Sequence, residues 1–562
     1  MTSSNKITDA SNTKTLLESC ESATRYLADL ENEARGQLAV CTMQNGKVSS
    51  TKLNEKQFAA HGCAWLATYC EALRQLLAWA KALHDRSLLT DLEHLILAAG
   101  FGEYLAQIRG GIAMSQVEIV RLSHLGIHPS SEKFFDTSEI IKLIEYGTND
   151  ETRSAIAELI CEDYFGDPGI EDSSLSMIKD QFRRFSDEQI APGAQTWHRE
   201  DLLIPDTIIA QMSDLGVFGL TIPERWGGIQ LGKIAMCMVT EELCRGYLGV
   251  GSLATRTEIA ADLILLHGTN SQKELWLEGL AKGTILPTAL FTEPGTGSDL
   301  ASVATQARLS RNSYLVTGAK TWSTHASRAD LMTMLVRTDS SKTGYEGVSM
   351  LMAPKPRGNS RSLFPAQGMS GTEIKVLGYR GMKEFEIAFS DFSVPKDCLL
   401  GGLEGQGFKQ LMGSMETARI QTAARALGVA QCALELGLNY AKDRIQFGKS
   451  IFTFPRIHGK LASMAVEIMI ARQLTWSAAR KKDSGERCDL EAGMAKLLAS
   501  RVAWASADNS VQIHGGNGYA EEYPISRVLV DSRILNVFEG TGEIQAQIIA
   551  RRLLERDQPL PH

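Results

Sequence analysis

The stretch that decides the fold lies near the C-terminus and reads Val537-Phe538-Glu539-Gly540-Thr541-Gly542-Glu543-Ile544-Gln545. Its first carboxylate, Glu539, stands between an apolar residue and a glycine, so we expect it to be partly desolvated. Burial disfavours the ionised form of a carboxyl group, raises its pKa and makes it a stronger base. Such a base could remove a proton from the carbon beside a carbonyl group. The alternative is that Glu539 only caps the following helix.

A second segment far upstream combines small, hydroxyl-bearing and glycine residues, and reads Phe291-Thr292-Glu293-Pro294-Gly295-Thr296-Gly297-Ser298-Asp299. Glycines let a flat ring or a phosphate approach the backbone, and hydroxyl groups can donate hydrogen bonds to it. Alone, the segment could be a simple tight turn. Taken with the stretch around Glu539, it predicts a flavin enzyme.

Composition limits the class of protein. The 562 residues are 44% hydrophobic and 22% charged, which is typical of a soluble globular protein with several domains. The net charge of −8 argues against binding to nucleic acid, because there is no basic excess to neutralise phosphates. The ten cysteines are scattered and form no metal-ligand spacing. That scatter predicts no metal site. Because no apolar run is long enough, we expect no membrane span, and because no signal-peptide pattern is present, we expect a cytoplasmic location.

The order of predicted elements divides the chain. Residues 1–15 are polar and predicted to be disordered, and 16–165 show helical periodicity broken by glycines such as Gly100 and Gly102. A second helical block covers 171–286, short β-forming segments fill 287–402, and 405–556 reads as several long helices. Helices, then strands, then helices is an uncommon order that narrows the choice of fold.

This order, with six short segments, resembles the acyl-CoA dehydrogenase family over about residues 171–556. The segments are Pro223–Gly228, Phe291–Asp299, Lys320–Thr324, Arg444–Lys449, Gln512–Tyr519 and Phe538–Gln545. The resemblance implies a helical domain, a β-barrel-like middle domain and a C-terminal four-helix bundle, here with an extra N-terminal helical domain. It also implies FAD as the cofactor and a homo-oligomer, either a dimer or a tetramer.

The resemblance assigns FAD contacts to residues from several parts of the chain. One group lies against the flavin ring, with Trp322 to Thr324 on a flanking strand and Thr324 near N5. Another group reaches the FAD of a neighbouring subunit, with Arg444 serving the pyrophosphate. Two more contacts follow Glu539, although Glu543 could equally be a solvated acid. The full set is Phe291, Thr292, Gly297, Ser298, Trp322, Ser323, Thr324, Arg444, Phe447, Gln512, Gly515, Gly516, Thr541 and Glu543.

By the same resemblance, Glu539 removes the α-proton of an acyl-CoA thioester while a hydride leaves the β-carbon for the flavin. The thioester oxygen would be held by the Glu539 backbone N–H and a flavin ribityl hydroxyl. Electrons would pass to electron-transfer flavoprotein. Contacts to the acyl-CoA are implied for Ser298, Glu416, Arg419 and Gly540. The alternative for Glu416 and Arg419, one turn apart on a helix, is a surface ion pair.

The N-terminal block resembles the extension of bacterial methylsuccinyl-CoA dehydrogenases within this family, which implies a short branched dicarboxylyl-CoA as the substrate. A free carboxylate in a pocket needs a cation, because an unpaired buried charge is costly. Arg256 is the nearest cation in an otherwise small and apolar stretch, with a solvated or ion-paired helix residue as the alternative. The other readings are a short branched-chain acyl-CoA dehydrogenase, an acyl-CoA oxidase and a non-catalytic scaffold.

Overall fold

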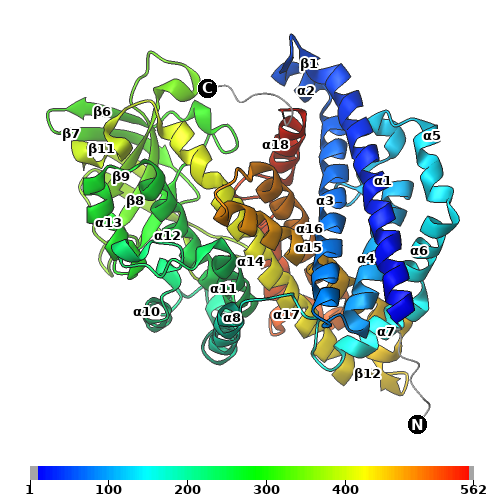
Figure 1. Cartoon of the computed structure of the whole chain (residues 1–562). Helices are drawn as coiled ribbons and strands as arrows, with labels where there is room; N and C mark the ends of the chain where they lie inside the picture. Colours follow the sequence, from blue (N-terminus) through cyan, green and yellow to red (C-terminus); the bar gives the residue numbers. More distant parts are fainter. Residues whose placement is uncertain (1–9, 556–562) are drawn as a thin grey trace. The chain divides into compact units, whose positions relative to one another are not determined.

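The computed structural model describes residues 10–555, and these form two compact units (Figure 1). The first unit combines the described residues up to Ser176 with Ala430–Lys481 and the described residues from Cys488 onward. The second unit consists of Met177–Val429 and Lys482–Arg487. The N-terminal extension therefore folds together with C-terminal helices. The other helical block and the β strands share the second unit.

The N-terminal extension is almost entirely helical, as the sequence predicts. Its main helices are α1 (Ala10–Thr42), α2 (Ser50–Glu55), α3 (Gln57–Asp85), α4 (Asp91–Gly110), α5 (Pro129–Glu132), α6 (Ser138–Thr148) and α7 (Asp150–Ile160). Short hairpins join some of them: β1 (Met43–Gln44) with β2 (Lys47–Val48), and β3 (Ile112–Ala113) with β4 (Ile119–Val120). Because α1 begins at Ala10, helix replaces the final residues of the predicted disordered tail, and residues 1–9 lie outside the described part.

Two glycines predicted to interrupt the extension lie inside an unbroken helix. Helix α4 continues through Gly100 and Gly102 to Gly110. A Cβ on Gly102 would lie 2.7 Å from the Cα of Gly147 in α6, and one on Gly147 would lie 2.2 Å from the carbonyl oxygen of Ala98. These glycines therefore permit the close approach of two helices, and α4 ends at Gly110, just before Gly111, whose φ is 134°.

The second unit opens with helices α8 (Ser173–Phe185), α9 (Ala191–Arg199), α10 (Asp206–Asp214), α11 (Gly232–Gly246), α12 (Leu248–His267) and α13 (Asn270–Ala281). Thr269 caps α13 well, since its hydroxyl accepts from the Gln272 backbone N–H (3.2 Å) and the Gln272 side chain accepts from the Thr269 N–H (3.0 Å). Helix α12 is buried along nearly its whole length. This burial places its side chains inside the unit.

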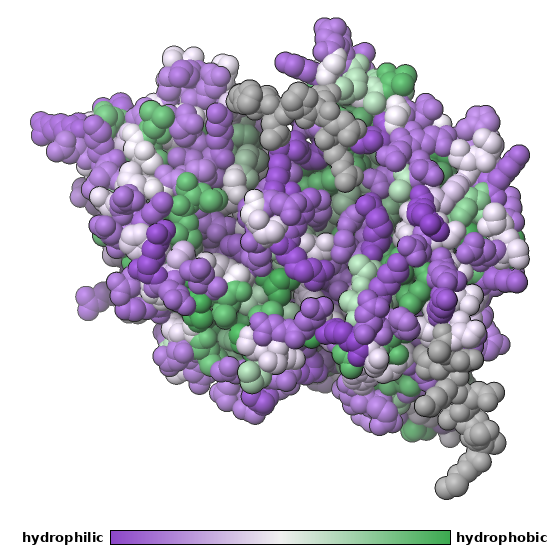
Figure 2. Space-filling model, in the orientation of Figure 1, coloured by the Kyte–Doolittle hydropathy of each residue, from purple (hydrophilic) through white to green (hydrophobic). Residues whose placement is uncertain are grey.

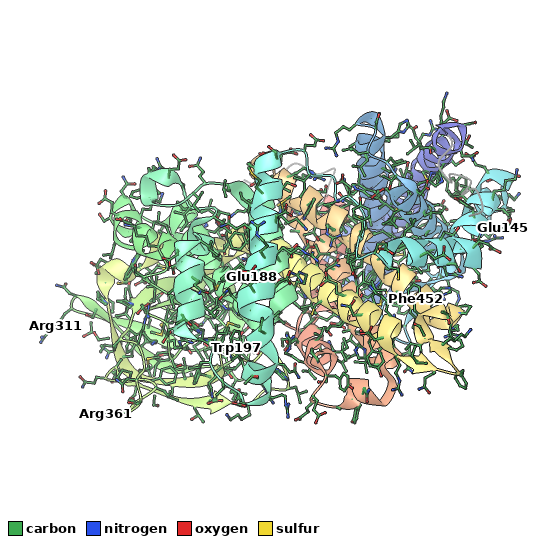
Figure 3. The ribbon with its side chains drawn as sticks, turned by 90° about the horizontal axis from the view of Figure 1, so that it is seen from below. Glu145, Glu188, Trp197, Arg311, Arg361 and Phe452 are labelled. Carbon is green, nitrogen blue, oxygen red and sulfur yellow. The ribbon has the colours of Figure 1, made fainter. Side chains whose placement is uncertain are left out.

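A seven-stranded sheet follows, ordered β10-β11-β7-β6-β8-β5 with β9 paired to β8. Its strands are β5 (Pro287–Leu290), β6 (Gln306–Ser310), β7 (Ser313–Lys320), β8 (Leu331–Arg337), β9 (Val348–Pro354), β10 (Met369–Ile374) and β11 (Glu384–Pro395). Strands β8 and β9 are buried on both faces, because α12 and α13 pack against one side and apolar side chains of β7 and β11 pack against the other. Arg311, in the turn between β6 and β7, points outward (Figure 3).

The C-terminal part consists of α14 (Gly407–Asp443), α15 (Pro455–Asp483), α16 (Asp489–His514), α17 (Pro524–Ile534) and α18 (Gly542–Glu555), with a hairpin of β12 (Ile445–Gln446) and β13 (Lys449–Ser450). The predicted order of helices, strands and helices is confirmed.

In Figure 2 hydrophilic residues cover most of the visible face and hydrophobic ones form scattered patches. Among the described residues, no helix has the length and apolar character that crossing a bilayer requires.

Candidate active site

The loop after β5 is held in place by a buried ion pair. The Glu293 carboxylate accepts hydrogen bonds from the backbone N–H groups of Ala304 (2.7 Å) and Thr305 (2.9 Å) and from Lys320 Nζ (2.8 Å). Lys320 also donates to the carbonyl oxygen of Phe291 (3.2 Å). Although burial opposes it, the Lys320 ammonium lowers the pKa of Glu293. The loop that follows is exposed at Gly297 and Ser298, whereas Phe291 and Thr292 are half-buried.

Trp322, Ser323 and Thr324 lie beside this loop, because the Thr321 N–H donates to the carbonyl oxygen of Thr292 (3.0 Å). The expectation that they belong to a strand is wrong: β7 ends at Lys320, and Trp322 has a φ of 55°, which is incompatible with an extended strand. The turn leaves the Trp322 side chain exposed (55%), while Ser323 and Thr324 are buried.

Arg256 belongs to a buried polar cluster within the second unit. Its Nη2 donates to Thr324 Oγ1 (3.1 Å) and to the Tyr379 hydroxyl (3.3 Å). Arg425, on α14, donates to the same Tyr379 hydroxyl (3.5 Å) and to Ser252 Oγ (3.4 Å). Two guanidinium groups thus converge on one phenol. Arg256 is half-buried among these groups, so it is not a fully solvated helix residue. Its role as a ligand for a substrate carboxylate stays a prediction, with an ion-paired helix residue as the alternative.

The sequence argument missed Arg425, Tyr379 and Glu384, which complete this cluster. Thr324 Oγ1 donates to Glu384 Oε2 (3.0 Å), and Glu384 and Arg425 are both buried. Arg425 left one signal, since it is a lone charge within the apolar run Ala423-Ala424-Arg425-Ala426-Leu427. Buried charges are rare unless they are paired, which makes such a residue a candidate site.

Glu416 and Arg419 lie on α14 as predicted, with Glu416 half-buried and Arg419 buried. Lys482 Nζ contacts Glu416 Oε2 at 2.6 Å, and the Arg419 side chain is buried. The alternative of a solvent-exposed ion pair is therefore wrong. Their role toward a CoA ligand stays a prediction.

Glu539 lies in the bend between α17 and α18, within the first unit. Its φ is 54°, a conformation that costs energy for a residue other than glycine and recurs at functional sites. The bend is anchored by Lys496 Nζ, which donates to the carbonyl oxygen of Gly540 (2.6 Å), and by Gln545 Nε2, which donates to that of Glu539 (3.1 Å). The Glu539 side chain is half-buried.

The cap of helix α18 is supplied by a residue other than Glu539. The Ile544 N–H donates to Thr541 Oγ1 (3.3 Å), so Thr541 supplies the side-chain cap of α18 that was the alternative role for Glu539. Glu543 is exposed in the first turn of α18, where a carboxylate is favoured by the helix dipole. Contacts of Thr541 and Glu543 with FAD stay predictions.

Tyr440 connects the two segments expected to reach a neighbouring subunit. Its carbonyl oxygen accepts from the Arg444 N–H (2.9 Å), and its ring stacks on His514 with centroids 4.2 Å apart. Arg444, Phe447, Gln512, Gly515 and Gly516 are all exposed, and Phe447 is 92% exposed with a φ of 52°. A large exposed aromatic ring on a strained hairpin suits an interface.

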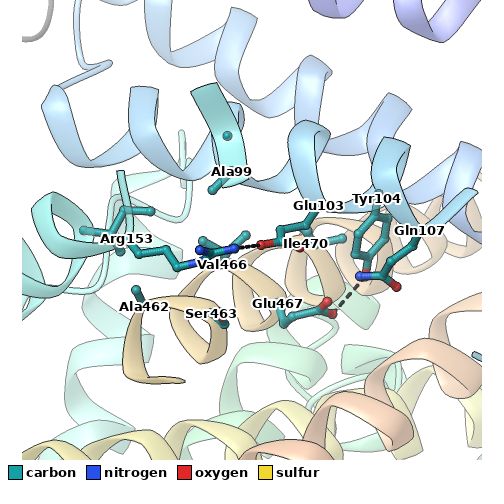
Figure 4. A pocket seen from close by; sticks show the side chains of 12 residues that line it. Ala99, Glu103, Tyr104, Gln107, Arg153, Ala462, Ser463, Val466, Glu467 and Ile470 are labelled. Atoms are coloured by element: carbon teal, nitrogen blue, oxygen red, sulfur yellow. Dashed lines mark hydrogen bonds and ion pairs between the residues drawn. The ribbon is translucent and has the colours of Figure 1, made fainter. Parts of the chain in front are cut away.

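A cavity of about 210 Å³ lies elsewhere in the first unit, between α4 and α15 (Figure 4). Its polar groups already pair with each other: Arg153 with Glu103 (2.9 Å) and the Tyr104 hydroxyl with Glu467 (2.9 Å). It contains none of the predicted site residues. We interpret it as part of the seam between the extension and the C-terminal helices.

Comparisons with known proteins place the chain in a family. Models of the N-terminal, middle and C-terminal domains of acyl-CoA dehydrogenases match residues 172–284, 288–392 and 405–554. A (2S)-methylsuccinyl-CoA dehydrogenase of Cereibacter sphaeroides is 57% identical over 93% of this chain and 95% of its own. The mitochondrial short-chain specific acyl-CoA dehydrogenase of Homo sapiens is 35% identical over 67% of this chain and 89% of its own.

The solved structures agree with this placement. The structure of the butyryl-CoA dehydrogenase of Megasphaera elsdenii aligns with a TM-score of 0.63 and 32% sequence identity, over 67% of this chain and 98% of its own. Its match leaves about a third of the present chain unaligned, whereas the Cereibacter relative covers nearly all of it. The chain belongs to the acyl-CoA dehydrogenase family.

Proposed function

We propose that this protein is an FAD-dependent dehydrogenase of a short branched dicarboxylyl-CoA, and that it oxidises (2S)-methylsuccinyl-CoA to mesaconyl-CoA. The 57% identity with a (2S)-methylsuccinyl-CoA dehydrogenase, over nearly the whole of both chains, carries this proposal. The convergence of Arg256 and Arg425 on Tyr379 supports it independently, because a buried cationic cluster offers a place for a substrate's distal carboxylate.

The residues around the flavin loop fit the proposed cofactor. A Cβ built on Gly295 or Gly297 meets no atom within 4 Å, so a flat ring can approach the loop. The Trp322 indole is exposed, and the buried Ser323 hydroxyl has no hydrogen-bond partner among the described residues. Thr292, Ser298, Trp322 and Thr324 would hold the flavin ring. Arg444, Phe447, Gln512, Gly515 and Gly516 would contact the FAD of a second copy.

In the proposed reaction Glu539 takes the α-proton, and its backbone N–H donates to the thioester oxygen as negative charge develops there. Bound FAD would supply the hydride acceptor, and electron-transfer flavoprotein would take the electrons onward. Lys496 and Gln545 fix the Glu539 backbone, which limits the cost of aligning the base with its proton.

Reduction of the bound flavin by a panel of acyl-CoA thioesters under anaerobic conditions tests the function. We expect (2S)-methylsuccinyl-CoA to bleach the flavin absorbance fastest, ahead of isobutyryl-CoA and 2-methylbutyryl-CoA. Faster bleaching by the monocarboxylyl thioesters would favour a short branched-chain dehydrogenase instead. Rapid formation of hydrogen peroxide in air would identify an oxidase, and an absence of bleaching by every thioester would favour a scaffold.

A further inference from the structure

Glu384, at the start of β11, is a buried carboxylate that the proposed reaction does not use. Its side chain is 4% exposed. Its Oε2 accepts from Thr324 Oγ1 (3.0 Å), and its Oε1 has no hydrogen-bond partner among the described residues. Burying a carboxylate with one oxygen that lacks a hydrogen bond costs folding free energy. We therefore expect a function for Glu384 in its environment beside Arg256.

The Thr324 hydroxyl connects Glu384 to Arg256. A hydroxyl group has one proton to donate and two lone pairs that accept. Arg256 Nη2 donates into one lone pair (3.1 Å). While Glu384 is ionised it can only accept, so the single Thr324 proton is committed to it. If Glu384 carried a proton on Oε2, it could donate to Thr324 instead, and the Thr324 proton would be released for another acceptor.

The surroundings place the titration of Glu384 near neutral pH. Burial raises its pKa to about 7, against the opposing effects of Arg256 and the Thr324 hydrogen bond. The other ionisable groups near it are Tyr379, whose pKa burial raises, Arg425 behind Tyr379, and His325, whose pKa burial and neighbouring cations lower to about 3. Its chain neighbour Lys383 is paired with Glu373 (3.0 Å) and lies 3.7 Å from Asp201.

We propose that the distal carboxylate of the substrate, on binding at Arg256 and Arg425, drives one proton from the solvent onto Oε2 of Glu384, and that this proton turns the Thr324 hydroxyl from Glu384 toward the flavin. The inference rests on the proposed dicarboxylyl-CoA substrate. A second carboxylate beside the same guanidinium groups repels an ionised Glu384, and the ligand also displaces water, so the neutral form gains on both counts.

In this step a buffer acid loses its proton and one O–H bond forms on Glu384, with no change in oxidation state. The new O–H of Glu384 then donates to the Thr324 oxygen in place of the bond it accepted before, so the Thr324 proton is available to the cofactor that the family resemblance places beside it. Glu384 is thus a positioning residue. It transmits the charge of the distal end of the substrate to the hydroxyl beside the hydride acceptor, and a monocarboxylyl substrate cannot trigger it.

Calorimetry of ligand binding to the FAD-loaded protein, at about pH 8 in buffers of different ionisation enthalpy, measures the proton uptake directly. The probes are mesaconyl-CoA, the product of the proposed reaction, and methacrylyl-CoA, which lacks the distal carboxylate. We expect mesaconyl-CoA to take up about one more proton per site than methacrylyl-CoA does. The difference should vanish in Glu384→Gln and persist in Glu386→Gln, a matched control on the same strand whose side chain is exposed.

Equal proton uptake with both ligands in the unmodified protein would overturn the inference, and this comparison needs no variant to fold. Failure of mesaconyl-CoA to bind at all would overturn the proposed substrate and the inference together. Steady-state kinetics add a second readout: KM for methylsuccinyl-CoA should rise about tenfold per pH unit above the pKa of Glu384, and Glu384→Gln should flatten this profile. A profile as steep in that variant as in the unmodified protein would contradict the role of Glu384.

Discussion

Lys496 donates a 2.6 Å hydrogen bond to the carbonyl oxygen of Gly540, the residue directly after the candidate base. The lysine is fully buried in α16, so the bond is shielded from water. It fixes the bend at the point where Glu539 adopts its unfavourable φ. The backbone position of the candidate base therefore depends on a lysine that is not among the predicted substrate contacts.

Replacing Lys496 with Met should lower kcat about 10- to 100-fold, because a base misplaced by a fraction of an ångström aligns poorly with its proton. Flavin content should stay the same. Stopped-flow reduction of the flavin measures the chemical step directly. Lys460→Met is the control, since that lysine donates to Asn509 (2.6 Å) away from the bend. Unchanged flavin reduction in both variants would show that Lys496 does not position the candidate base.

Glu539→Gln should keep FAD bound and lose at least about a thousandfold in kcat, because the amide cannot accept the α-proton. The absorbance spectrum of the purified variant reports the flavin, and anaerobic mixing with substrate reports the rate. Glu522→Gln is the control, because this glutamate is exposed, lies in the same unit and belongs to none of the predicted contacts. Normal turnover by Glu539→Gln would refute the assignment of the base.

Arg256→Leu should raise KM for methylsuccinyl-CoA about a hundredfold and change KM for isobutyryl-CoA much less, because only the former needs a partner for its carboxylate. Arg308→Leu, at an exposed position of β6, should leave both constants unchanged. Initial rates with the two substrates provide the comparison. Equal effects of Arg256→Leu on both would exclude it as the carboxylate ligand.

The raised pKa of Glu384 predicts a pH-dependent cost to stability. The folded state favours the neutral acid, so the stability that this group contributes is fully present below its unfolded pKa of 4.5 and is lost as the pH rises through about 7. Glu384→Gln should therefore raise the free energy of unfolding by up to about 3 kcal/mol at about pH 8, with a matching rise in Tm, and change neither at about pH 4. Thermal scans beside Glu386→Gln test this, and a pH-independent difference would contradict it.

Phe447→Ser should weaken the homo-oligomer and lower FAD occupancy together, if this exposed ring covers the cofactor of a second copy. Sedimentation velocity and the ratio of flavin to protein absorbance measure the two effects. Val40→Ser, at a residue 82% exposed on α1 and outside the matched family domains, is the control. Loss of neither property would place Phe447 outside an interface.

The sequence predicts the order of elements well because helical and strand periodicities are local. Strand β8, for example, lies within residues 287–402, where the sequence predicts short β-forming segments. The polar cluster was only partly predictable. Arg256 stood out within a small and apolar stretch, but Glu384 and Tyr379 acquire their meaning only when α12, β11 and the loop at Thr324 come together.

The same limit explains the glycines of the extension. Gly102 and Gly147 are 45 positions apart in the sequence, and nothing local shows that their backbones touch. A glycine inside a helical pattern favours a break when read alone. Here the contact between α4 and α6 stabilises the continuous helix, so tertiary packing overrides the local preference.

Arg501, on α16, is enclosed by the aromatic side chains of the extension. It lies 4.9 Å from the ring of Trp65 and 5.1 Å from that of Tyr69, and its Nη1 donates to the Tyr69 hydroxyl (2.6 Å). Shortening the chain to its three family domains would remove the aromatic rings around this cation and expose the apolar surface against which α3 packs. Such a shortened protein should aggregate and not fold as an independent enzyme.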